Sequence, residues 1–327
     1  MVTSPEYRGV SHGKVILIGE HSAVYAQPAI VLPLADARME AVVTPHTRAA
    51  ADVRIHCEYF SGKLSEAPDI LHNLQVLVQR VRYDFGLETQ GFDLTITSTI
   101  PHERGMGSSA AVAVAIVRAL AKFASVPLSF TQEFEYAQIA ENIAHTNASG
   151  MDSATVASNS AVWFQRTDDE PDISTFGFHT DGVIIVADTG VMGQTRETVS
   201  DVRALIRAQE AVGEMSAARA GMDRLGKLAY ECADALQLNE LAHVGFCMNE
   251  AQSILAGLGV SSAELDTLTS AARTAGALGA KLTGSGRGGC MIALAGSSAS
   301  AGYVRQALED AGAQRTWMIP LVSQGVQ

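Results

Sequence analysis

The pattern of apolar and polar positions in the first half of the chain predicts strands with helices between them. The segment 69–85 has apolar residues at helical spacing, so we expect a helix with one buried face. The residues of that face are Ile70, Leu74, Leu77, Val78 and Val81. Short apolar runs and one stretch of strict alternation predict strands at 14–18, 29–34, 39–44, 92–100 and 182–190.

Residues 101–124, PHERGMGSSAAVAVAIVRALAKFA, combine a glycine-rich turn with a helix that is apolar on nearly every face. Gly105 and Gly107 allow a tight turn, and Ser108 and Ser109 follow at the start of the helix, where N–H groups are unpaired. Such a turn can hold a phosphate at the positive end of the helix dipole. An ordinary loop with a serine N-cap is the alternative for this stretch alone.

Beyond this helix the capping-box spacing of Ser129 and Gln132 predicts another helix, from near Ser129 to about His145. TNASGMD is rich in turn formers, and DSATVASNSAVWFQR returns toward strand character. The charged segment 167–172 is typical of an exposed hairpin or loop.

The second half is mostly helical in its spacing. Helices are predicted over about 197–238, 240–257 and 262–276, with a last helix near 299–311 and a last strand near 315–321. The glycine-rich segment 281–290 lies between two β-like stretches. We expect an α+β protein with an N-terminal domain at 1–181 and a C-terminal domain at 182–327.

Composition narrows the class of protein. The chain has 327 residues, of which 47% are hydrophobic, and a net charge of −12, which argues against nucleic-acid and anionic-membrane partners. Its four cysteines form no CxxC pair, so neither a disulfide framework nor a zinc site is implied. The start of the chain lacks a signal-peptide core, and no apolar run is long enough to span a membrane; we expect a cytoplasmic protein.

The two later glycine loops match a dinucleotide pattern, GxGxxA at 105–110 and GxGxxG at 284–289. A Rossmann fingerprint also needs an acidic residue about 20 positions later at a strand end, and neither loop has one there. Neither loop ends in Gly-Lys-Ser/Thr, so a Walker A loop is excluded as well.

Several polar residues have the chemistry of phosphoryl transfer. Ser109, Glu141 and Asp152 offer hard oxygen ligands for Mg²⁺ or a base for an acceptor hydroxyl, although Glu141 alone fits a solvated helix and Asp152 alone a turn. Lys14 precedes an apolar strand, where burying a cation is costly. Either the lysine faces a cleft, or it lies at the edge of the strand with its ammonium group in water. His21 could bond a substrate or serve a structural role.

Taken together, these segments resemble a known superfamily, that of galactokinase, homoserine kinase, mevalonate kinase and phosphomevalonate kinase. GKVILIGEHSAVYAQPAI resembles its N-terminal motif, PHERGMGSSAA its phosphate loop and KLTGSGRGGC its third motif. ENIAHTNASGMDSA resembles the segment with the family's glutamate and aspartate. The residues after Glu20-His21, together with ADTGVMGQTRETV at 187–199, favour the mevalonate kinase branch of bacterial type.

The resemblance implies ATP-dependent phosphorylation of the 5-hydroxyl of (R)-mevalonate, in isoprenoid biosynthesis, with Mg²⁺ as cofactor. It implies a fold that pairs a domain like ribosomal protein S5 domain 2 with a ferredoxin-like C-terminal domain. Asp152 would be the base, Lys14 would stabilise charge, and Ser109 and Glu141 would bind the metal. The implied substrate-binding residues are Lys14, Glu20, His21, Asp152 and Thr195. The implied nucleotide-binding residues are Gly105, Met106, Gly107, Ser108, Ser109 and Ala110 for the phosphates and Gly284, Ser285 and Gly286 in the third motif.

Two positions depart from the family pattern. Arg287 stands where glycine is usual, and Asn159-Ser160 stands where a Gly-Gly pair often follows the aspartate. Phosphomevalonate kinase is the alternative within the superfamily, and a non-catalytic metabolite sensor on the same fold is the alternative outside catalysis. A homodimer is an open alternative for the assembly.

Overall fold

The structure is a computed structural model that describes residues 5–46, 51–144, 148–175, 177–211 and 216–322. It has two compact units, and neither is one continuous stretch of chain. Unit 1 comprises Met1–Lys14, Leu34–Pro101 and Gly107–Ser158, and unit 2 comprises Val15–Pro33, His102–Met106 and Asn159–Gln327. The predicted domain boundary at residue 181 stays a prediction.

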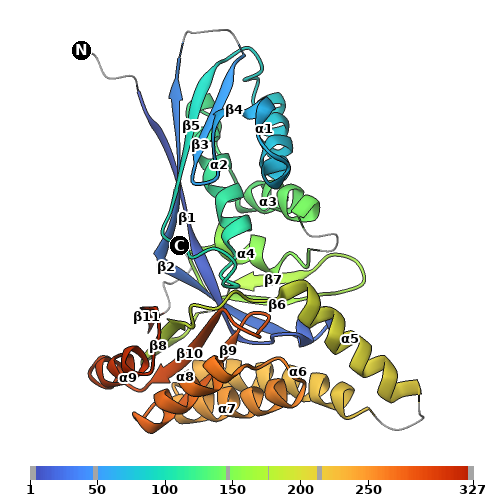
Figure 1. Ribbon diagram of the computed structural model, residues 1–327, viewed down its shortest axis with the longest axis vertical. Coiled ribbons are helices and arrows are strands. Elements are labelled where there is room, and N and C mark those ends of the chain that lie inside the picture. Colours follow the sequence, from blue (N-terminus) through green and yellow to red (C-terminus); the bar gives the residue numbers. More distant parts are fainter. Residues whose placement is uncertain (1–4, 47–50, 145–147, 176, 212–215, 323–327) are drawn as a thin grey trace. The chain divides into compact units, whose positions relative to one another are not determined.

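Unit 1 packs helices against a mostly antiparallel sheet (Figure 1). Its strand order is β4-β3-β5-β2, with β1 also paired to β2; β3 and β5 run parallel. Its strands are β3 (Val53–Cys57), β4 (Phe60–Lys63) and β5 (Phe92–Ser98), with the part of β1 (Tyr7–Ile18) up to Lys14 and the part of β2 (Ala29–Pro45) from Leu34. The helices are α1 (His72–Asp84), α2 (Ser108–Ala124), α3 (Phe130–Ala144) and α4 (Met151–Ala157).

Close packing of β1 on α2 depends on a residue without a side chain. A Cβ placed on Gly9 would lie 2.0 Å from the carbonyl oxygen of Ala115, so any larger residue would separate strand and helix. The centre of α2 is buried on almost every side, as its uniformly apolar sequence predicts. Arg118 is the one charged residue in that buried stretch.

The structure differs from the predicted strands at β2, which is one strand where two were expected. Pro33 lies between the residues that pair with β6, Ala29–Val31, and those that pair with β5, Met39–Pro45. The missing N–H of proline therefore removes no hydrogen bond to either partner.

The predicted apolar face of α1 also needs one correction. Ile70 precedes α1 and is 64% exposed, whereas the other predicted residues of that face are buried.

Helix α4 was expected to have strand character. Every residue of α4 except Asp152 is buried, so the segment has no polar face whose spacing could indicate a helix. Gly150 precedes the helix with φ 91°. The strand begins only at β6 (Val162–Gln165). The predicted end of α3 near His145 lies outside the described residues.

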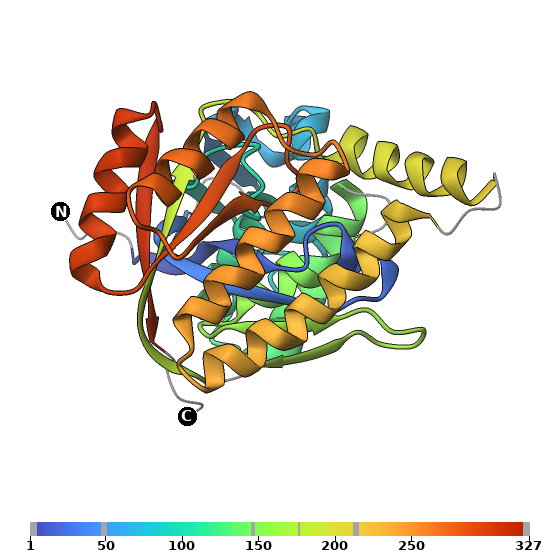
Figure 2. The same cartoon turned by 90° about the horizontal axis from the view of Figure 1, so that it is seen from below.

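Unit 2 contains a four-stranded antiparallel sheet in the order β11-β8-β10-β9. Its strands are β8 (His179–Asp188), β9 (Gly279–Thr283), β10 (Cys290–Ala295) and β11 (Arg315–Val322). Helices α7 (Leu241–Gly257), α8 (Ala263–Thr274) and α9 (Ser298–Asp310) pack on this sheet, and α6 (Ala217–Gln237) lies beside α7 (Figure 2). The hairpin of β6 and β7 (Asp172–Thr175) also belongs to unit 2 and confirms the loop predicted at 167–172.

The helix predicted over 197–238 is two helices, α5 (Thr195–Ala211) and α6. Ser216 caps α6 by accepting a hydrogen bond from the backbone N–H of Arg219. That cap marks a helix start inside a sequence whose apolar spacing continues without a clear break.

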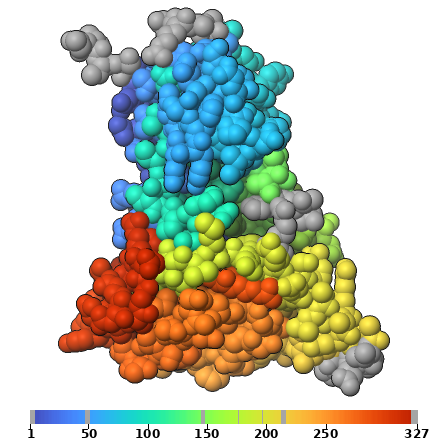
Figure 3. Space-filling model, viewed as in Figure 1, coloured from blue at the N-terminus to red at the C-terminus, as the bar shows by residue number. Residues whose placement is uncertain are grey.

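In the space-filling view, α1 lies on the outer surface of unit 1, with its blue atoms in the upper part of Figure 3.

The mixed helix and sheet architecture confirms the predicted α+β class. Among the described residues, no helix is long and apolar enough to cross a membrane. All four cysteines are free thiols; Cys57 is half-buried and the other three are buried.

Candidate active site

The glycine-rich turn leads directly into α2, as predicted. Gly105 and Gly107 have φ values of 73° and 70°, in the region that favours glycine. Gly107 is the N-cap of α2, and no side chain caps the helix. Ser108 and Ser109 are therefore the first residues of the helix and are half-buried, which leaves the N–H groups of this first turn available to an anion.

Lys14 and Asp152 form an ion pair inside unit 1. The Nζ of Lys14 lies 2.8 Å from Oδ1 of Asp152. The lysine side chain is only 4% exposed and lies on β1, whereas Asp152 is 33% exposed in the first turn of α4. One carboxylate oxygen is thus held beside a buried ammonium while the group still reaches solvent. This is the arrangement that a positioned base needs.

The phosphate loop also contacts the lysine. A Cβ on Gly107 would lie 3.0 Å from Cγ of Lys14, so the lysine stem passes directly under the N-cap of α2. A residue larger than glycine at 107 would push the lysine aside and would also be strained by its positive φ. The position of the Lys14 side chain therefore depends on a glycine at position 107.

Glu141 is buried in α3, and Ser109 lies in the first turn of α2. These two helices pack on each other within unit 1. Both side chains offer oxygen atoms only, which suits Mg²⁺. Their role as metal ligands stays a prediction.

In unit 2 the N-terminal motif is bound to strand β9. The Nζ of Lys281 donates a hydrogen bond to Oε1 of Glu20, and both side chains are fully buried. Burial lowers the pKa of Lys281, and the charge of Glu20 opposes that shift. Glu20 thus binds a lysine that sequence reasoning did not single out.

His21, the next residue, has φ 60° and lies against the third motif. Its Nε2 is 2.9 Å from the carbonyl oxygen of Ser285. Burial lowers the pKa of His21, with the nearby Arg287 acting in the same direction. The hydroxyl of Thr195, at the start of α5, lies 2.9 Å from that of Ser285. Ser285 therefore joins two of the predicted substrate residues.

The unusual arginine of the third motif occupies a backbone position that favours glycine. Arg287 has φ 53°, in the left-handed region where a side chain is strained. Its guanidinium donates hydrogen bonds to the carbonyl of Gly259 at 3.1 Å and to Asp201 at 2.5 Å. These bonds offset the strain that glycine would avoid.

Sequence reasoning missed a second ion pair of unit 2. Nε of Arg104, just before the phosphate loop, lies 2.9 Å from Oδ1 of Asp188, at the end of β8, and its Nη2 donates to the carbonyl of Gly190 at 3.0 Å. Asp188 belongs to the segment ADTGVMG, whose position directly after a buried strand was the available signal.

One further cluster could in principle hold a metal. Glu231, His243 and Cys247 offer oxygen, nitrogen and sulfur atoms within 4.8 Å of one another. The guanidinium of Arg224 already binds the Glu231 carboxylate at 2.5 Å. A second cation there would be repelled by that arginine, so these side chains are not assigned a metal.

Comparisons with known proteins show which family of sequences the chain is similar to. The model of the GHMP kinases N terminal domain matches residues 72–160, and that of the GHMP kinases C terminal domain matches residues 217–314. The chain is 32% identical to a curated mevalonate kinase of Thermococcus gammatolerans, over 86% of this chain and 87% of that protein. It is also 32% identical to one of Aeropyrum pernix, over 88% of each chain.

Solved structures show the same fold. Mevalonate kinase of L. major in complex with R-mevalonate has a TM-score of 0.81 at 24% identity and covers 99% of each chain. Mevalonate kinase of methicillin-resistant Staphylococcus aureus is 30% identical with a TM-score of 0.70, covering 97% of this chain and 99% of that one.

Proposed function

The chain belongs to the mevalonate kinases of the GHMP kinase family, and we propose that it transfers the γ-phosphoryl group of ATP to the 5-hydroxyl of (R)-mevalonate. The observation that carries the proposal is the ion pair of Lys14 and Asp152, at 2.8 Å. It supplies a base and a cation within hydrogen-bond reach of each other, close to the loop that can hold phosphates.

In this reaction Asp152 accepts the proton of the 5-hydroxyl as the alcohol oxygen bonds to the γ-phosphorus. The bond between that phosphorus and the β–γ bridging oxygen breaks, so ADP leaves with the bonding electron pair. The ammonium of Lys14 stabilises the negative charge that develops on the transferring group. The amides of residues 105–110 supply oriented N–H donors for the phosphates.

The residues proposed for Mg²⁺ are Ser109 and Glu141, which fit a metal that takes only oxygen ligands. When bound with ATP, the metal would neutralise charge on the β- and γ-phosphates. His21 and Thr195, both beside Ser285, are the proposed substrate residues of unit 2. Glu20 is proposed to act on the substrate site through its buried contact with Lys281.

A coupled assay of ADP formation tests the proposal. Purified protein is given ATP and Mg²⁺ with mevalonate, phosphomevalonate, homoserine or galactose in parallel reactions. We expect turnover with mevalonate at a kcat/KM at least about 100-fold above that with each other alcohol. Turnover of another alcohol without turnover of mevalonate would reject the assignment, and dependence on phosphomevalonate would make the protein a phosphomevalonate kinase.

A further inference from the structure

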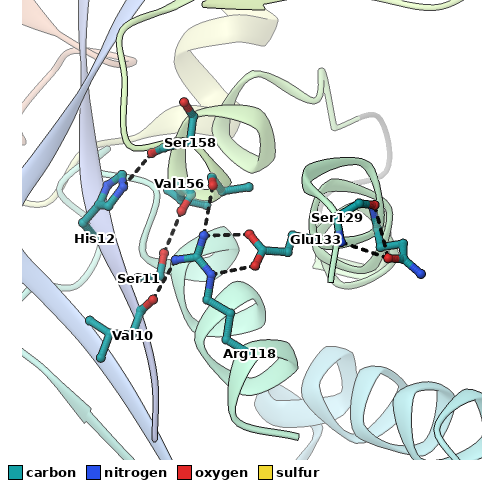
Figure 4. A network of polar contacts seen from close by, with 10 residues as sticks. Val10, Ser11, His12, Arg118, Ser129, Glu133, Val156 and Ser158 are labelled. Carbon is teal, nitrogen blue, oxygen red and sulfur yellow. Dashed lines mark hydrogen bonds and ion pairs between the residues drawn. The ribbon is translucent and has the colours of Figure 1, made fainter. Parts of the chain in front are cut away.

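The C-terminal end of α4 is held by side chains from two other elements. The last carbonyls of a helix have no partner within the helix, so they must find donors elsewhere. Ser11 Oγ donates to the carbonyl of Val156 at 2.9 Å, and Arg118 Nη2 donates to that of Ala157 at 2.9 Å. Nε2 of His12 lies 2.8 Å from the carbonyl of Ser158 (Figure 4). Each of the three consecutive carbonyls therefore has its own side-chain partner.

Ser11 and Arg118 donate their hydrogen bonds whatever the tautomer of the third residue, His12. Both ring nitrogens of His12 face carbonyl oxygens, because Nδ1 lies 2.9 Å from that of Gly13. Burial lowers the pKa of His12, and the charge of Arg118 acts in the same direction, so the ring is neutral near pH 7. A neutral imidazole has one N–H and can donate to only one of these carbonyls.

Arg118 links four elements of unit 1. Its Nε and Nη2 donate to the two carboxylate oxygens of Glu133 on α3 at 2.8 and 2.6 Å. Its Nη1 donates to the carbonyl of Val10 on β1 at 2.7 Å (Figure 4). The guanidinium also places a positive charge at the C-terminal end of α4, where it interacts favourably with the negative end of the helix dipole. Only the planar fork of an arginine can make all these bonds together.

These contacts fix the two elements that carry the Lys14–Asp152 pair. Val10, Ser11 and Lys14 lie within five consecutive residues of β1, and Asp152 lies on α4, a helix of seven residues. A helix of that length is about 10 Å long, so a movement at its C-terminal end moves its first turn as well. We propose that Ser11 and Arg118 are positioning residues that set the place of Asp152 relative to Lys14. The proposal rests on the role of Asp152 in the proposed function.

Two substitutions test it. Arg118→Lys keeps the charge but cannot bind Glu133 and two carbonyls together, and Ser11→Ala removes one hydrogen bond with little change of volume. We expect kcat to fall by about 10- to 100-fold in R118K and by about 3- to 10-fold in S11A. The KM values for ATP and mevalonate should stay within about two-fold, because neither residue is proposed to touch a substrate.

Hydrogen–deuterium exchange of the protein without substrates gives the second measurement. The amides of residues 154–158 should exchange faster in both variants than in the unmutated protein. Arg224→Lys is the matched control, since the guanidinium of Arg224 in unit 2 also makes several hydrogen bonds at once, to the carboxylates of Glu231 and Glu250. It should lower stability and leave both kcat and the exchange of α4 unchanged.

The two proposals fail in different ways. Absence of turnover with mevalonate in the unmutated protein counts against the proposed function, and the exchange measurement still reports on α4. Unchanged exchange of α4 in both variants overturns the positioning role. Faster exchange with unchanged kcat for whichever alcohol the protein phosphorylates overturns it too, because the contacts would then be structural only.

Discussion

The buried ammonium of Lys14 lies 2.8 Å from a carboxylate oxygen of Asp152, although one residue belongs to the first strand and the other to a helix after the phosphate loop. The pair lies within unit 1 and is held from both sides. Gly107 leaves room for the lysine stem, and the contacts at the end of α4 hold the helix that carries the aspartate.

Asp152→Asn should lower kcat by about 100- to 10,000-fold, because the amide cannot accept the proton of the acceptor hydroxyl. ATP binding, measured by calorimetry, should change little. Glu264→Gln is the control, since Glu264 is also an acidic residue in the first turn of a helix but belongs to α8. Equal turnover of D152N and the unmutated protein would exclude Asp152 as the base.

Lys14→Met should lower kcat by about 100-fold or more, since the methionine fills the buried space but carries no charge for the transferring phosphoryl group. Lys14→Arg should retain more activity than the methionine variant. In the control Lys122→Met, the lost cation binds the backbone carbonyl of Arg8, outside the proposed site, and turnover should persist. Steady-state rates at saturating ATP and mevalonate are measured for the three variants. A fully active K14M would contradict the proposed role of Lys14 in stabilising charge.

Removal of Mg²⁺ by a chelator should abolish ADP formation, and added Mg²⁺ should restore it. Ser109→Ala and Glu141→Gln should each raise the Mg²⁺ concentration needed for half-maximal rate by about ten-fold or more, since each removes one proposed oxygen ligand. The control is Ser253→Ala at an exposed position of α7, which should leave the Mg²⁺ dependence unchanged. A Mg²⁺ dependence unchanged in both variants would remove these residues from the metal site.

Lys281→Met should lower the free energy of unfolding of unit 2 by about 3–5 kcal/mol, because it leaves the buried carboxylate of Glu20 without its lysine. The double variant Glu20→Gln, Lys281→Met should recover a large part of that loss. Both tryptophans, Trp163 and Trp317, belong to unit 2, so their fluorescence during urea unfolding reports on that unit. In the exposed pair of Arg305 and Glu309, R305M should change the stability much less than K281M does. A double variant less stable than K281M would contradict the expectation.

Stability should fall as the pH is lowered from 7.5 to 5.5. The pKa values of His12 and His21 are lowered in the folded protein, mainly by burial, so the unfolded chain binds protons at a higher pH than the folded one. The contribution of each neutral ring is complete above its unfolded pKa, near 6.5, and is lost as the pH falls toward the folded pKa. The groups that face them are Arg118 and two carbonyls for His12, and Arg287 and the Ser285 carbonyl for His21.

Urea denaturation at the two pH values measures the effect. A His12→Gln variant should lose less stability between pH 7.5 and 5.5 than the unmutated protein, because glutamine does not titrate. His179→Gln, at an exposed position of β8, is the control and should behave like the unmutated protein. An equal loss of stability in H12Q would show that His12 does not titrate as described.

The sequence predicted those parts of the fold in which one face of an element is polar. The four correct residues of the α1 face, the start of α2 and most helices of unit 2 follow from spacing and caps. Helix α4 was missed because it is almost entirely buried, and β2 was divided at Pro33 because the proline lies between two sets of partners. The buried α2 was recognised because its sequence is long and apolar, whereas α4 has only seven residues and includes the polar Ser153 and Thr155. Whether a partner strand needs the N–H at Pro33 is not visible in the sequence.

The same limit applies to the candidate site. Lys14 and Asp152 were singled out by type and resemblance, and their distance comes from tertiary packing. Lys281 and Arg118 were not singled out, although a signal existed. Each is a charged residue at the edge of or within an apolar stretch, where burial requires a partner. Which carboxylate or carbonyl would be that partner depends on contacts between distant parts of the chain.

The division of the chain has a consequence for the order in which the protein folds during synthesis. Glu20 and Lys281 are 261 positions apart, and most of unit 1 is translated between them. The segment 15–33 is therefore synthesised long before the strands that complete unit 2. Until those strands are made, the segment has no contacts with the rest of its unit. Unit 2 can close its core only near the end of translation, once β9, β10 and β11 have been made.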